Sequence, residues 1–430
     1  MANNHLLEAL ANWDPAQAER VFGEEVALRS PDPAVTLAPI KRVAIFAEAF
    51  LPKVDGVSKT AYLSMHYLKQ TGRDVIVFAP DIAPHWIGDT QIVPLPSLSF
   101  PQAPETRVAF PHPTISYHLD QFKPDLIHLF SPAIMSVSGM IAARQMNIPV
   151  IANYQTDLPG YATAYGYSVF SQLTRDWLRY IHNGCHLTLA PSRYTMRELQ
   201  AWGFRRLRQW GRGVNGERFH PRHASHEWRA RLLNGRPPDS LLCIYVGRLA
   251  NEKRIDLLLE AARTPGVALT IIGDGALRGE LEQLFAGTDT YFTGYLFGDD
   301  LSHAFASADA FMFTGGNETF GQVVQEAMAS GLPALVINQG GVVDLVEDGV
   351  NGFICEPEPQ SFADAARKLL ESESLRRQMS AAARAYAEAR PWHTIMAQLE
   401  THYAEALALN ERYKRRFPPF GIIPPMFWFR

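Results

Sequence analysis

The chain has 430 residues, 47% of them hydrophobic, so its length and composition allow two or three domains with cores of their own. Its formal net charge of −4 at pH 7 gives no global field that indicates nucleic acid as a partner. The cysteines, Cys185, Cys243 and Cys355, form no CxxC pair and no zinc quartet with nearby histidines, which favours a reducing cytoplasm.

The amino-terminal segment, residues 1–38, is acidic and ends in the proline-rich stretch SPDPAVTLAP, which indicates a short helical arm and a linker. It lacks the basic and apolar regions of a secretory signal, and no run of roughly 18 apolar residues could span a bilayer. We therefore expect a soluble cytoplasmic protein, or one attached only peripherally to the inner face of the plasma membrane.

A regular alternation of strands and helices begins at Lys41. Apolar runs such as RVAIFAEAF, RDVIVFAP, DLIHLFSP, IPVIANYQ and HLTLAPS are typical of buried strands, and amphipathic stretches such as DGVSKTAYLSMHYLKQTG lie between them. Strands that alternate with helices pair in parallel. Residues 39–218 are therefore predicted to form one doubly wound, Rossmann-like α/β domain.

A second alternation follows the loop-rich passage GRGVNGERFHPRHASHEW. Its predicted strands are LLCIYVGRL, VALTIIGDG, TYFTGYL, DAFMFTG, PALVIN and GFICEP, so residues 219–390 form a second predicted Rossmann-like domain. A helix and a basic, aromatic tail occupy residues 391–430. Because ligands bind beyond the carboxyl ends of strands in such sheets, two facing domains predict an elongated ligand in the cleft between them.

The loop DGVSKTAYL, residues 55–63, places Gly56 and Val57 after the first strand. A glycine there lets the backbone approach a phosphate closely, although taken alone Gly56 more often marks only a turn. The loop is not a GxGxxG fingerprint, and no such fingerprint follows either first strand. This pattern argues against a nicotinamide or flavin enzyme.

Two later strand ends of the first domain carry polar side chains. His128 ends the strand in PDLIHLFSP, and Gln155, Asp157 and Tyr161 follow the next strand in NYQTDLPGY. We expect these residues to face the cleft and to contact the acceptor or the sugar. A single histidine at a strand end is more often a structural hydrogen-bonding group, which is the alternative for His128.

The segment GRLANEKRID, residues 247–256, brings Arg248 and Lys253 into one loop after the first strand of the second domain. Arginine holds phosphate oxygens bidentately and lysine acts as a movable point charge, so this pair suits a diphosphate and the charge left on a departing nucleotide. The alternative is a solvated loop in which Lys253 pairs with its neighbour Glu252.

Two weaker segments, IIGDGALRG and FTGYLFGDD, also follow strands. Their residues Gly273, Gly294 and Tyr295 would place main-chain groups around a nucleotide base. Asp299 and Asp300 lie at a predicted helix start, where acidic residues usually cap the helix, so we expect no metal there.

The most informative segment is GGNETFGQVVQEAMASG, residues 315–331, where a glycine-rich turn leads from a strand into a helix. If the whole step from Glu318 to Glu326 were helical, their backbones would lie roughly 12 Å apart, too far for the carboxyl pair of a retaining glycosidase. We expect them to hold different parts of one long ligand. The N–H groups of Phe320, Gly321 and Gln322 would donate to phosphate or sugar oxygens. The alternative is an ordinary capped helix with Glu326 as a surface charge.

Together, GRLANEK, GDG, ETFGQVVQEAMASGLPALV and GGVVDLVEDGVNGF resemble the family 4 glycosyltransferases of the GT-B fold, and the resemblance extends over about residues 41–390. Within that family, NYQTDLPGYATAYGY, RGVNGERFHP and ETFGQVVQEA are most similar to GDP-mannose-dependent α-mannosyltransferases that act on glycolipids. Sulfoquinovosyl- and glucosyl-diacylglycerol synthases come next. Gln155 stands where many relatives have histidine, and Asn215 where aspartate is usual.

The resemblance implies that Arg248 and Lys253 hold the donor diphosphate, that Glu318 holds the sugar hydroxyls and that Glu326 holds the ribose. It also implies that the carboxyl-terminal helix crosses back onto the first domain. The implied catalytic residues are Arg248, Lys253 and Glu318, and the implied donor-binding residues are Gly56, Val57, Gly273, Gly294, Tyr295, Thr319, Phe320, Gly321 and Glu326. A nucleotide sugar is the co-substrate, so neither a cofactor nor a metal is expected.

The implied reaction transfers a hexose, first of all mannose from GDP-mannose, to a hydroxyl of a glycolipid or other acceptor with retained configuration. A UDP-sugar-dependent diacylglycerol glycosyltransferase is the alternative donor class. An epimerase or phosphorylase on the same fold, or a non-catalytic nucleotide-sugar-binding protein, remains open. The basic stretches 193–212 and 412–430 predict docking on an anionic membrane, with a solvated face and tail as the alternative.

Overall fold

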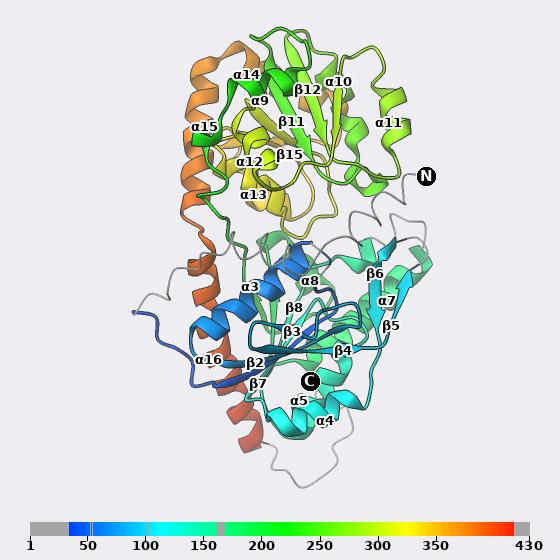
Figure 1. Ribbon diagram of the computed structural model, residues 1–430, viewed down its shortest axis with the longest axis vertical. Helices are drawn as coiled ribbons and strands as arrows, with labels where there is room; N and C mark the ends of the chain where they lie inside the picture. The colour runs from blue at the N-terminus through cyan, green and yellow to red at the C-terminus, as the bar shows by residue number, and fades with distance from the viewer. Residues whose placement is uncertain (1–33, 52, 54, 101–102, 161–167, 417–430) are drawn as a thin grey trace.

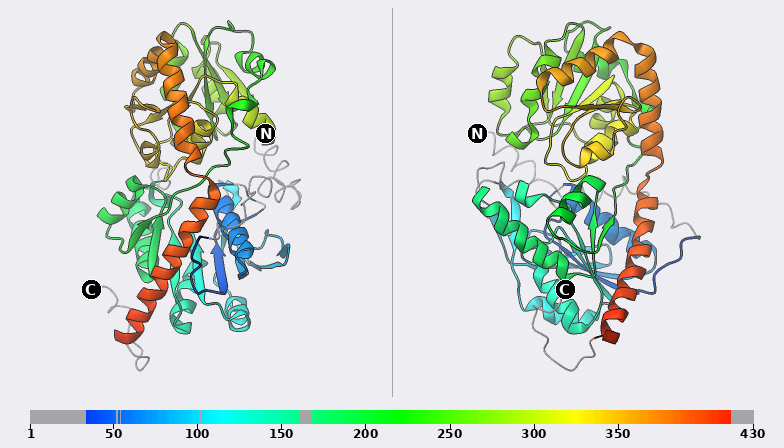
Figure 2. Two further views of the ribbon diagram at one scale, coloured as in Figure 1. Left: turned by 90° about the vertical axis from the view of Figure 1, so that its left-hand side faces the viewer. Right: turned by 180° about the vertical axis from the view of Figure 1, so that it is seen from behind.

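The computed structural model describes residues 34–416 apart from 52, 54, 101–102 and 161–167, and these residues form two domains, one above the other in Figure 1. Each domain is built around its own largely parallel β-sheet, and helices cover both faces of each sheet (Figures 1 and 2). The prediction of two doubly wound α/β domains is confirmed. The predicted arm up to residue 33, the tail beyond Arg416, and Tyr161 lie outside the described residues.

The first domain contains an eight-stranded sheet among the described residues, in the order β10-β9-β8-β7-β1-β2-β4-β3. Only β3 is antiparallel to its neighbour there. The sequence pattern does not predict the separate antiparallel hairpin of β5 (Ser97–Phe100) and β6 (Ala103–Ala109). The sheet strands are β1 (Arg42–Ala47), β2 (Asp74–Pro80), β3 (Trp86–Ile87), β4 (Thr90–Leu95), β7 (Leu126–Phe130), β8 (Val150–Asn153), β9 (Leu187–Ala190) and β10 (Leu207–Gln209).

Strand β1 is apolar throughout because its residues alternate between two cores. Val43 and Ile45 pack with α3 and α16 on one face of the sheet, whereas Ala44 and Phe46 pack with α4 and α5 on the other. A parallel sheet covered on both faces needs such continuous apolar strands. The described helices of this domain are α3 (Gly56–Gln70), α4 (Thr114–Phe122), α5 (Ser136–Met146), α7 (Ser168–Gly184), α8 (Arg193–Ala201) and the returning helix α16 (Trp392–Arg416).

The second domain contains a six-stranded sheet in the order β13-β12-β11-β14-β15-β16, in which the described neighbours are all parallel. Its strands are β11 (Leu241–Val246), β12 (Val267–Ile272), β13 (Tyr291–Gly294), β14 (Ala310–Phe313), β15 (Ala334–Ile337) and β16 (Gly352–Cys355). Its α-helices are α9 (His226–Leu233), α10 (Leu259–Ala262), α11 (Arg278–Leu284), α12 (Gly298–Ala306), α13 (Gln322–Ala329), α14 (Pro359–Glu371) and α15 (Glu373–Glu388). This arrangement matches the six predicted strands.

The chain crosses from the first domain to the second between Trp210 and Val214. Trp210 belongs to the first-domain core, whereas Val214 and Phe219 belong to the second-domain core. The crossover therefore lies a few residues before the predicted boundary at 218/219. Val214 also forms a parallel bridge with Pro391, so the outgoing and returning segments run side by side.

Helix α16 returns to the first domain and packs along it, as Figure 2 shows for the long carboxyl-terminal helix. Its buried Glu400 pairs with Arg73 (Nη2–Oε2, 2.6 Å) and accepts a hydrogen bond from Tyr67 (3.0 Å). The expectation that this helix crosses back is confirmed.

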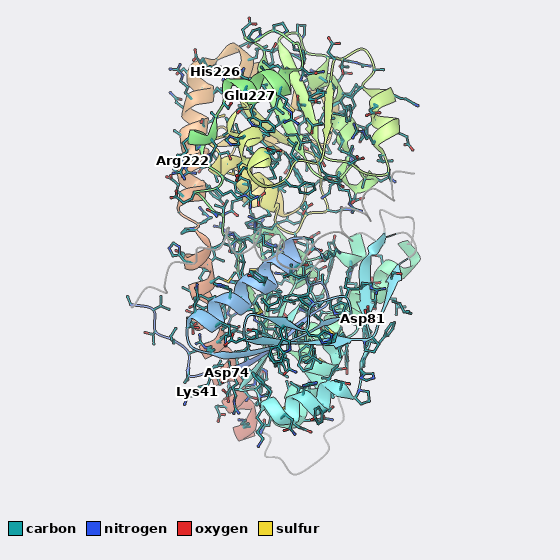
Figure 3. All side chains as sticks on the ribbon, viewed as in Figure 1. Lys41, Asp74, Asp81, Arg222, His226 and Glu227 are labelled. Carbon is teal, nitrogen blue, oxygen red and sulfur yellow. The ribbon has the colours of Figure 1, made fainter. Side chains whose placement is uncertain are left out.

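The carboxyl ends of the first sheet face the second domain. Lys41 and Asp74, at the amino ends of β1 and β2, lie on the side away from the second domain (Figure 3). The segments that follow β8 and β9 instead hydrogen-bond to the second domain through Gln155 and Thr195. Within the described part of the chain, no helix is both long and apolar enough to cross a membrane.

Candidate active site

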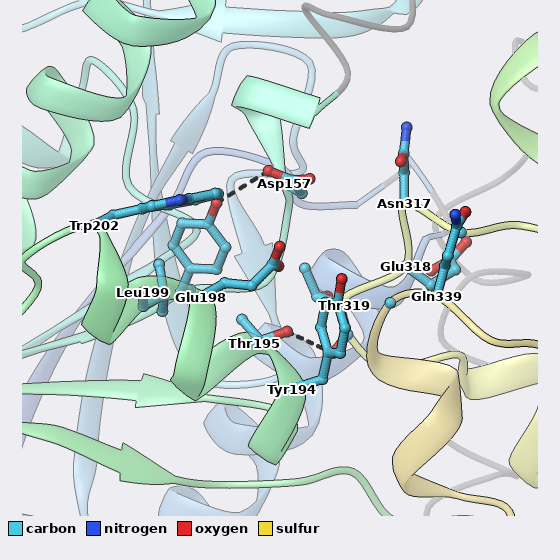
Figure 4. Close-up of a pocket in the computed structure, with 13 residues that line it drawn as sticks. Asp157, Tyr194, Thr195, Glu198, Leu199, Trp202, Asn317, Glu318, Thr319 and Gln339 are labelled. Carbon is cyan, nitrogen blue, oxygen red and sulfur yellow. Dashed lines mark hydrogen bonds between the residues drawn. The ribbon is translucent and has the colours of Figure 1, made fainter.

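A cavity of about 190 Å³ lies where the two domains meet (Figure 4). The first domain lines it with the segment after β8 and with one face of α8, and the second domain lines it with the loops after β14 and β15. The polar lining residues are Tyr154, Asp157, Tyr194, Thr195, Glu198, Asn317, Glu318, Thr319 and Gln339. Predicted residues from both domains, Asp157 and Glu318, thus share one cavity.

The loop that carries Glu318 is fixed against the first domain. Thr319 donates its hydroxyl to the carbonyl of Gln155 (2.7 Å), and its own carbonyl accepts the hydroxyl of Thr195 (3.0 Å). Farther along, Glu326 pairs with Lys59 of α3 (3.5 Å). The predicted contact of Glu326 with a ribose stays a prediction, and the observed contact is an ion pair between the domains.

Glu318 is surrounded by cations. It forms an ion pair with Lys253, which follows the neighbouring strand β11. Burial acts to raise the pKa of Glu318, but Lys253, Arg212 and Arg248 together lower that pKa below its usual range. The carboxylate is therefore ionised across the neutral range.

The two predicted cations, Arg248 and Lys253, pair with different carboxylates. Arg248 pairs with the buried Glu252 (2.6 Å), whereas Lys253 pairs with Glu318 and its side chain is 13% exposed. The alternative of a solvated loop is wrong, because Glu252 is buried and the Lys253 side chain is largely covered. Because β11 and β14 are adjacent in the sheet, the segments after them meet at one edge.

The start of α13 has the geometry of an anion site. Gly321 precedes the helix with φ +93°, and no described side chain caps it. A Cβ on Gly321 would lie 2.5 Å from Val342 Cγ1, so only glycine fits this close approach. The first N–H groups of α13 are therefore not capped by any described side chain, and the predicted contact of the Phe320 and Gly321 N–H groups with phosphate or sugar oxygens stays a prediction.

Three more predicted donor residues meet at the ends of β12 and β13. Gly273 donates its N–H to the carbonyl of Gly294 (2.9 Å), and the hydroxyl of Tyr295 donates to the carbonyl of Asp274 (2.9 Å). A Cβ on Gly273 would lie 1.9 Å from the carbonyl oxygen of Gly247. This turn is thus packed against the loop that carries the two cations, and its contact with a base stays a prediction.

The start of α3 differs from the open phosphate loop that we predict. Asp55 caps this helix and accepts the N–H groups of Val57 (3.0 Å) and Ser58 (2.8 Å). The space beside Gly56 holds the guanidinium of Arg212, which donates to the Gly56 carbonyl. The backbone amides at this position are therefore occupied by Asp55, and a contact of Gly56 or Val57 with phosphate stays a prediction.

His128 does not face the cleft. Its side chain is fully buried between the sheet and α16, where Nδ1 contacts the hydroxyl of Tyr403 (2.9 Å) and Nε2 contacts Oδ1 of Asn153 (2.9 Å). Burial lowers the pKa of His128 to about 4. The expected contact of His128 with acceptor or sugar is wrong, and its structural alternative is correct.

Gln155 is 8% exposed, and its Oε1 has no hydrogen-bond partner among the described residues.

Glu198 was not predicted as a site residue, yet its carboxylate points toward Asp157 in the cavity (Figure 4). Burial raises the pKa of both carboxyl groups, and the charge of Asp157 raises that of Glu198 further. Asp157 also accepts hydrogen bonds from the Tyr154 hydroxyl (3.3 Å) and the Gly160 N–H (3.1 Å). The available signal was the spacing of Tyr194, Glu198 and Trp202, which repeats every four residues on one face of α8.

Within the described residues, no group of three or more histidine, cysteine, aspartate or glutamate side chains could hold a metal ion. Asp299 and Asp300 lie in the first turn of α12, but the N-cap position is Phe297 and no described side chain caps the helix, so the expected capping role is wrong. The site thus offers cations and N–H groups on the second domain and carboxylates on the first. The former suit a nucleoside diphosphate, and the latter accept hydrogen bonds from hydroxyl groups.

Two family signatures match the chain, "Glycosyltransferase Family 4" over residues 54–218 and "Glycosyl transferases group 1" over residues 227–386. The chain is 35% identical to a GDP-mannose-dependent α-mannosyltransferase of Corynebacterium glutamicum over 385 residues, 87% of this chain and 92% of the relative. It is 37% identical to a protein of the same description from Mycobacterium tuberculosis over 371 residues, 84% of this chain and 96% of the relative. Sulfoquinovosyl transferase SQD2 of Arabidopsis thaliana is 31% identical over 404 residues, 91% of this chain and 78% of the relative.

Solved structures show the same fold. Sucrose-phosphate synthase from Thermosynechococcus elongatus superposes with a TM-score of 0.70 at 20% identity, covering 86% of this chain and 99% of that one. HepE of Anabaena in complex with UDP superposes with a TM-score of 0.66 at 20% identity, covering 85% and 100%. The chain therefore belongs to the family 4 glycosyltransferases, and its two facing domains have the GT-B fold.

Proposed function

We propose that this chain is a retaining α-mannosyltransferase that moves mannose from GDP-mannose to a hydroxyl of a glycolipid. The observation that carries the proposal is the Lys253–Glu318 ion pair at the start of α13, beside a cavity that both domains line. The descriptions of the bacterial relatives support GDP-mannose as the donor.

The donor diphosphate would lie against Lys253, Arg248 and the N–H groups at the start of α13. Glu318 would orient the sugar and balance the positive charge that develops on its anomeric carbon. A diphosphate that takes the place of Glu318 as the partner of Lys253 would leave this carboxylate available for the sugar hydroxyls.

The transfer step breaks the bond between the anomeric carbon and the phosphate oxygen, and forms a bond from that carbon to the acceptor oxygen on the same face. The departing phosphate takes the acceptor proton, so no covalent nucleophile is needed. Asp157 and Glu198 would hold the acceptor by accepting hydrogen bonds from its hydroxyls. Positioning and electrostatic stabilisation supply the rate.

A UDP-sugar-dependent transferase is the second candidate, and the similarity to the Arabidopsis sulfoquinovosyl transferase favours it. The residues around Lys253 bind the diphosphate that both donors share, so they do not distinguish the two bases. The choice of base would depend on the turns around Gly273 and Gly294.

The lipid acceptor and attachment to the inner face of the plasma membrane are further parts of the proposal. The basic stretch 193–212 is not one exposed cationic face, because Arg206 bonds to the carbonyls of Asn183 and Cys185 and Arg212 is buried. Any membrane affinity of this stretch must therefore come from its exposed arginines, Arg193, Arg197, Arg205 and Arg208, of which Arg208 already pairs with Glu405. Flotation of the full chain with anionic vesicles tests it, and a protein that stays at the bottom of the gradient would contradict membrane attachment.

A transfer assay tests the proposed reaction. The full chain is incubated with GDP-mannose or UDP-glucose and with a bacterial glycolipid extract, and the product is digested with α- or β-mannosidase. We expect GDP-mannose to be consumed and the product to be sensitive to α-mannosidase. Consumption of UDP-glucose alone would favour the second candidate, and a product cleaved only by β-mannosidase would contradict retention.

A further inference from the structure

Arg212 lies in the crossover between the domains, close to the start of two helices. On one side, the carbonyl of the next residue, Gly213, accepts a hydrogen bond from the side chain of Gln322, the first residue of α13 (3.0 Å). On the other side, Arg212 itself reaches the first turn of α3. Its side chain is therefore held between the predicted donor loops of the two domains, and it is 6% exposed.

The contacts of the guanidinium are with neutral groups. Nη1 donates to the carbonyl of Gly56 and to the hydroxyl of Thr60 (3.0 Å). A Cβ on Gly56 would lie 2.7 Å from Nη1, so the absence of a side chain at this position makes room for the arginine. The guanidinium is thus fixed at the site where the sequence pattern predicts a phosphate.

No described carboxylate forms an ion pair with Arg212. Asp55 pairs with Lys53 (3.1 Å), and Glu318 pairs with Lys253. Nε of Arg212 is buried and has no hydrogen-bond partner among the described residues. Burial lowers the pKa of Arg212 to about 10, although the charges of Asp55 and Glu318 oppose this shift, so the group remains cationic at neutral pH.

A buried cation is costly unless an anion pairs with it, and its free donor then favours a ligand that carries negative charge. The ligand implied at this place is the diphosphate of the donor, because Lys253, Arg248 and Arg212 all act on the same carboxylate, Glu318. We propose that Arg212 binds the donor diphosphate as a third cation, beside Lys253 and Arg248. This inference rests on the proposed function.

A purely structural role, in which Arg212 only clamps α3 to the crossover, makes a different prediction. Loss of a clamp would loosen the domain arrangement and weaken every nucleotide alike. Loss of a diphosphate contact would weaken GDP more than GMP, because GMP lacks the second phosphate. Thr60→Val provides the matched control, since it removes one neutral contact of the arginine and leaves the charge in place.

The test is isothermal titration of the full-length wild type, Arg212→Gln and Thr60→Val with GDP and with GMP, after circular dichroism has shown that each variant is folded. We expect Arg212→Gln to weaken GDP binding by about 10- to 100-fold, the loss of one charge-assisted contact. We expect it to weaken GMP binding by no more than about threefold, and Thr60→Val to leave both affinities within about twofold. If Arg212→Gln does not fold, Arg212→Lys replaces it, with a GDP-selective loss of about three- to tenfold.

Three results would overturn the inference and leave the proposed function intact. Arg212→Gln could weaken GDP and GMP binding equally, or it could leave the affinity for GDP unchanged. Thr60→Val could also weaken GDP binding as much as Arg212→Gln does. If the wild type binds UDP rather than GDP, the same comparison is made with UDP and UMP. A wild type that binds no nucleoside diphosphate would contradict the proposed function itself, and the inference with it.

Discussion

At the scale of single residues, the site depends on pairs that are distant in sequence. Lys253 and Glu318 are 65 positions apart, and the family resemblance implied that both act on the donor. The structure brings them together because the strands before them, β11 and β14, are neighbours in one parallel sheet. The surroundings of His128 and Arg212 were not predicted from the sequence. The partner of His128 is Tyr403, 275 positions away on a helix from the other end of the chain, and Arg212 lies in a crossover with no periodic pattern.

We expect turnover to depend most on Glu318. We expect Glu318→Gln to lower GDP-mannose turnover by about 10²- to 10³-fold, since it removes charge stabilisation of the transition state. GDP should bind more tightly to this variant, because Lys253 loses its anionic partner. Steady-state kinetics and titration measure the two effects.

Glu282→Gln serves as the control for Glu318→Gln, because Glu282 pairs with Arg278 on the surface of α11 (2.8 Å) and lies outside the cavity. Full turnover by Glu318→Gln would show that the catalytic assignment is wrong.

Asp157 and Glu198, the two carboxylates that the first domain contributes to the cavity, should lower the stability of the folded protein at neutral pH. The folded-state pKa values of Asp157 and Glu198 are raised, so the folded protein binds more protons than the unfolded chain, and stability falls as pH rises through the raised values. Glu318 has the opposite sign, because its lowered pKa contributes stability that is lost only as pH falls.

Asp157→Asn tests this sign, since asparagine keeps an oxygen that can accept from Tyr154 and Gly160. We expect its Tm to exceed that of the wild type by about 2 °C at pH 7.5, with the difference shrinking towards pH 4. We also expect a lower kcat/KM for the acceptor. Asp120→Asn, an exposed change on α4, should show neither effect. A wild type that is more stable than Asp157→Asn at pH 7.5 would contradict the account.

At the scale of elements, the sequence pattern predicted the strands of the second domain and the start of its central helix. The alternation of apolar and amphipathic segments predicts all the described strands of the second sheet, because buried parallel strands have continuous apolar sequences. Helix α13 begins at Gln322, so Glu318 lies in the preceding loop and Glu326 within the helix, as the sequence pattern predicts. The return of α16 followed only from the family resemblance, since its contacts with the first domain are all long-range.

Helix α16 should be essential for the stability of the first domain. Glu400→Gln would leave Arg73 buried without its anion, and we expect a loss of about 3–5 kcal/mol in the free energy of unfolding. Glu405→Gln on the same helix breaks a surface pair with Arg208 and should cost less than about 1 kcal/mol. Denaturant unfolding compares the two variants. A small effect of Glu400→Gln would mean that α16 docks mainly through its apolar residues.

At the scale of the whole molecule, the site exists only where the two domains meet. The sequence predicts the two domains and the cleft, but it does not predict which side chains cross the boundary. Contacts such as Thr319 with Gln155, or Lys59 with Glu326, depend on how two separately folded surfaces fit together. The boundary was misplaced by a few residues for a similar reason, because only packing shows that Val214 belongs to the second core.

The central claim is that the second domain binds a guanosine diphosphate sugar at Lys253. Isothermal titration with GDP, UDP and ADP, carried out on the full-length wild type and on the Lys253→Met variant, tests this claim most directly. We predict that GDP binds most tightly and that Lys253→Met weakens it by about tenfold or more, through loss of a charged contact. Tighter binding of UDP, or no effect of Lys253→Met on any nucleotide, would contradict the account.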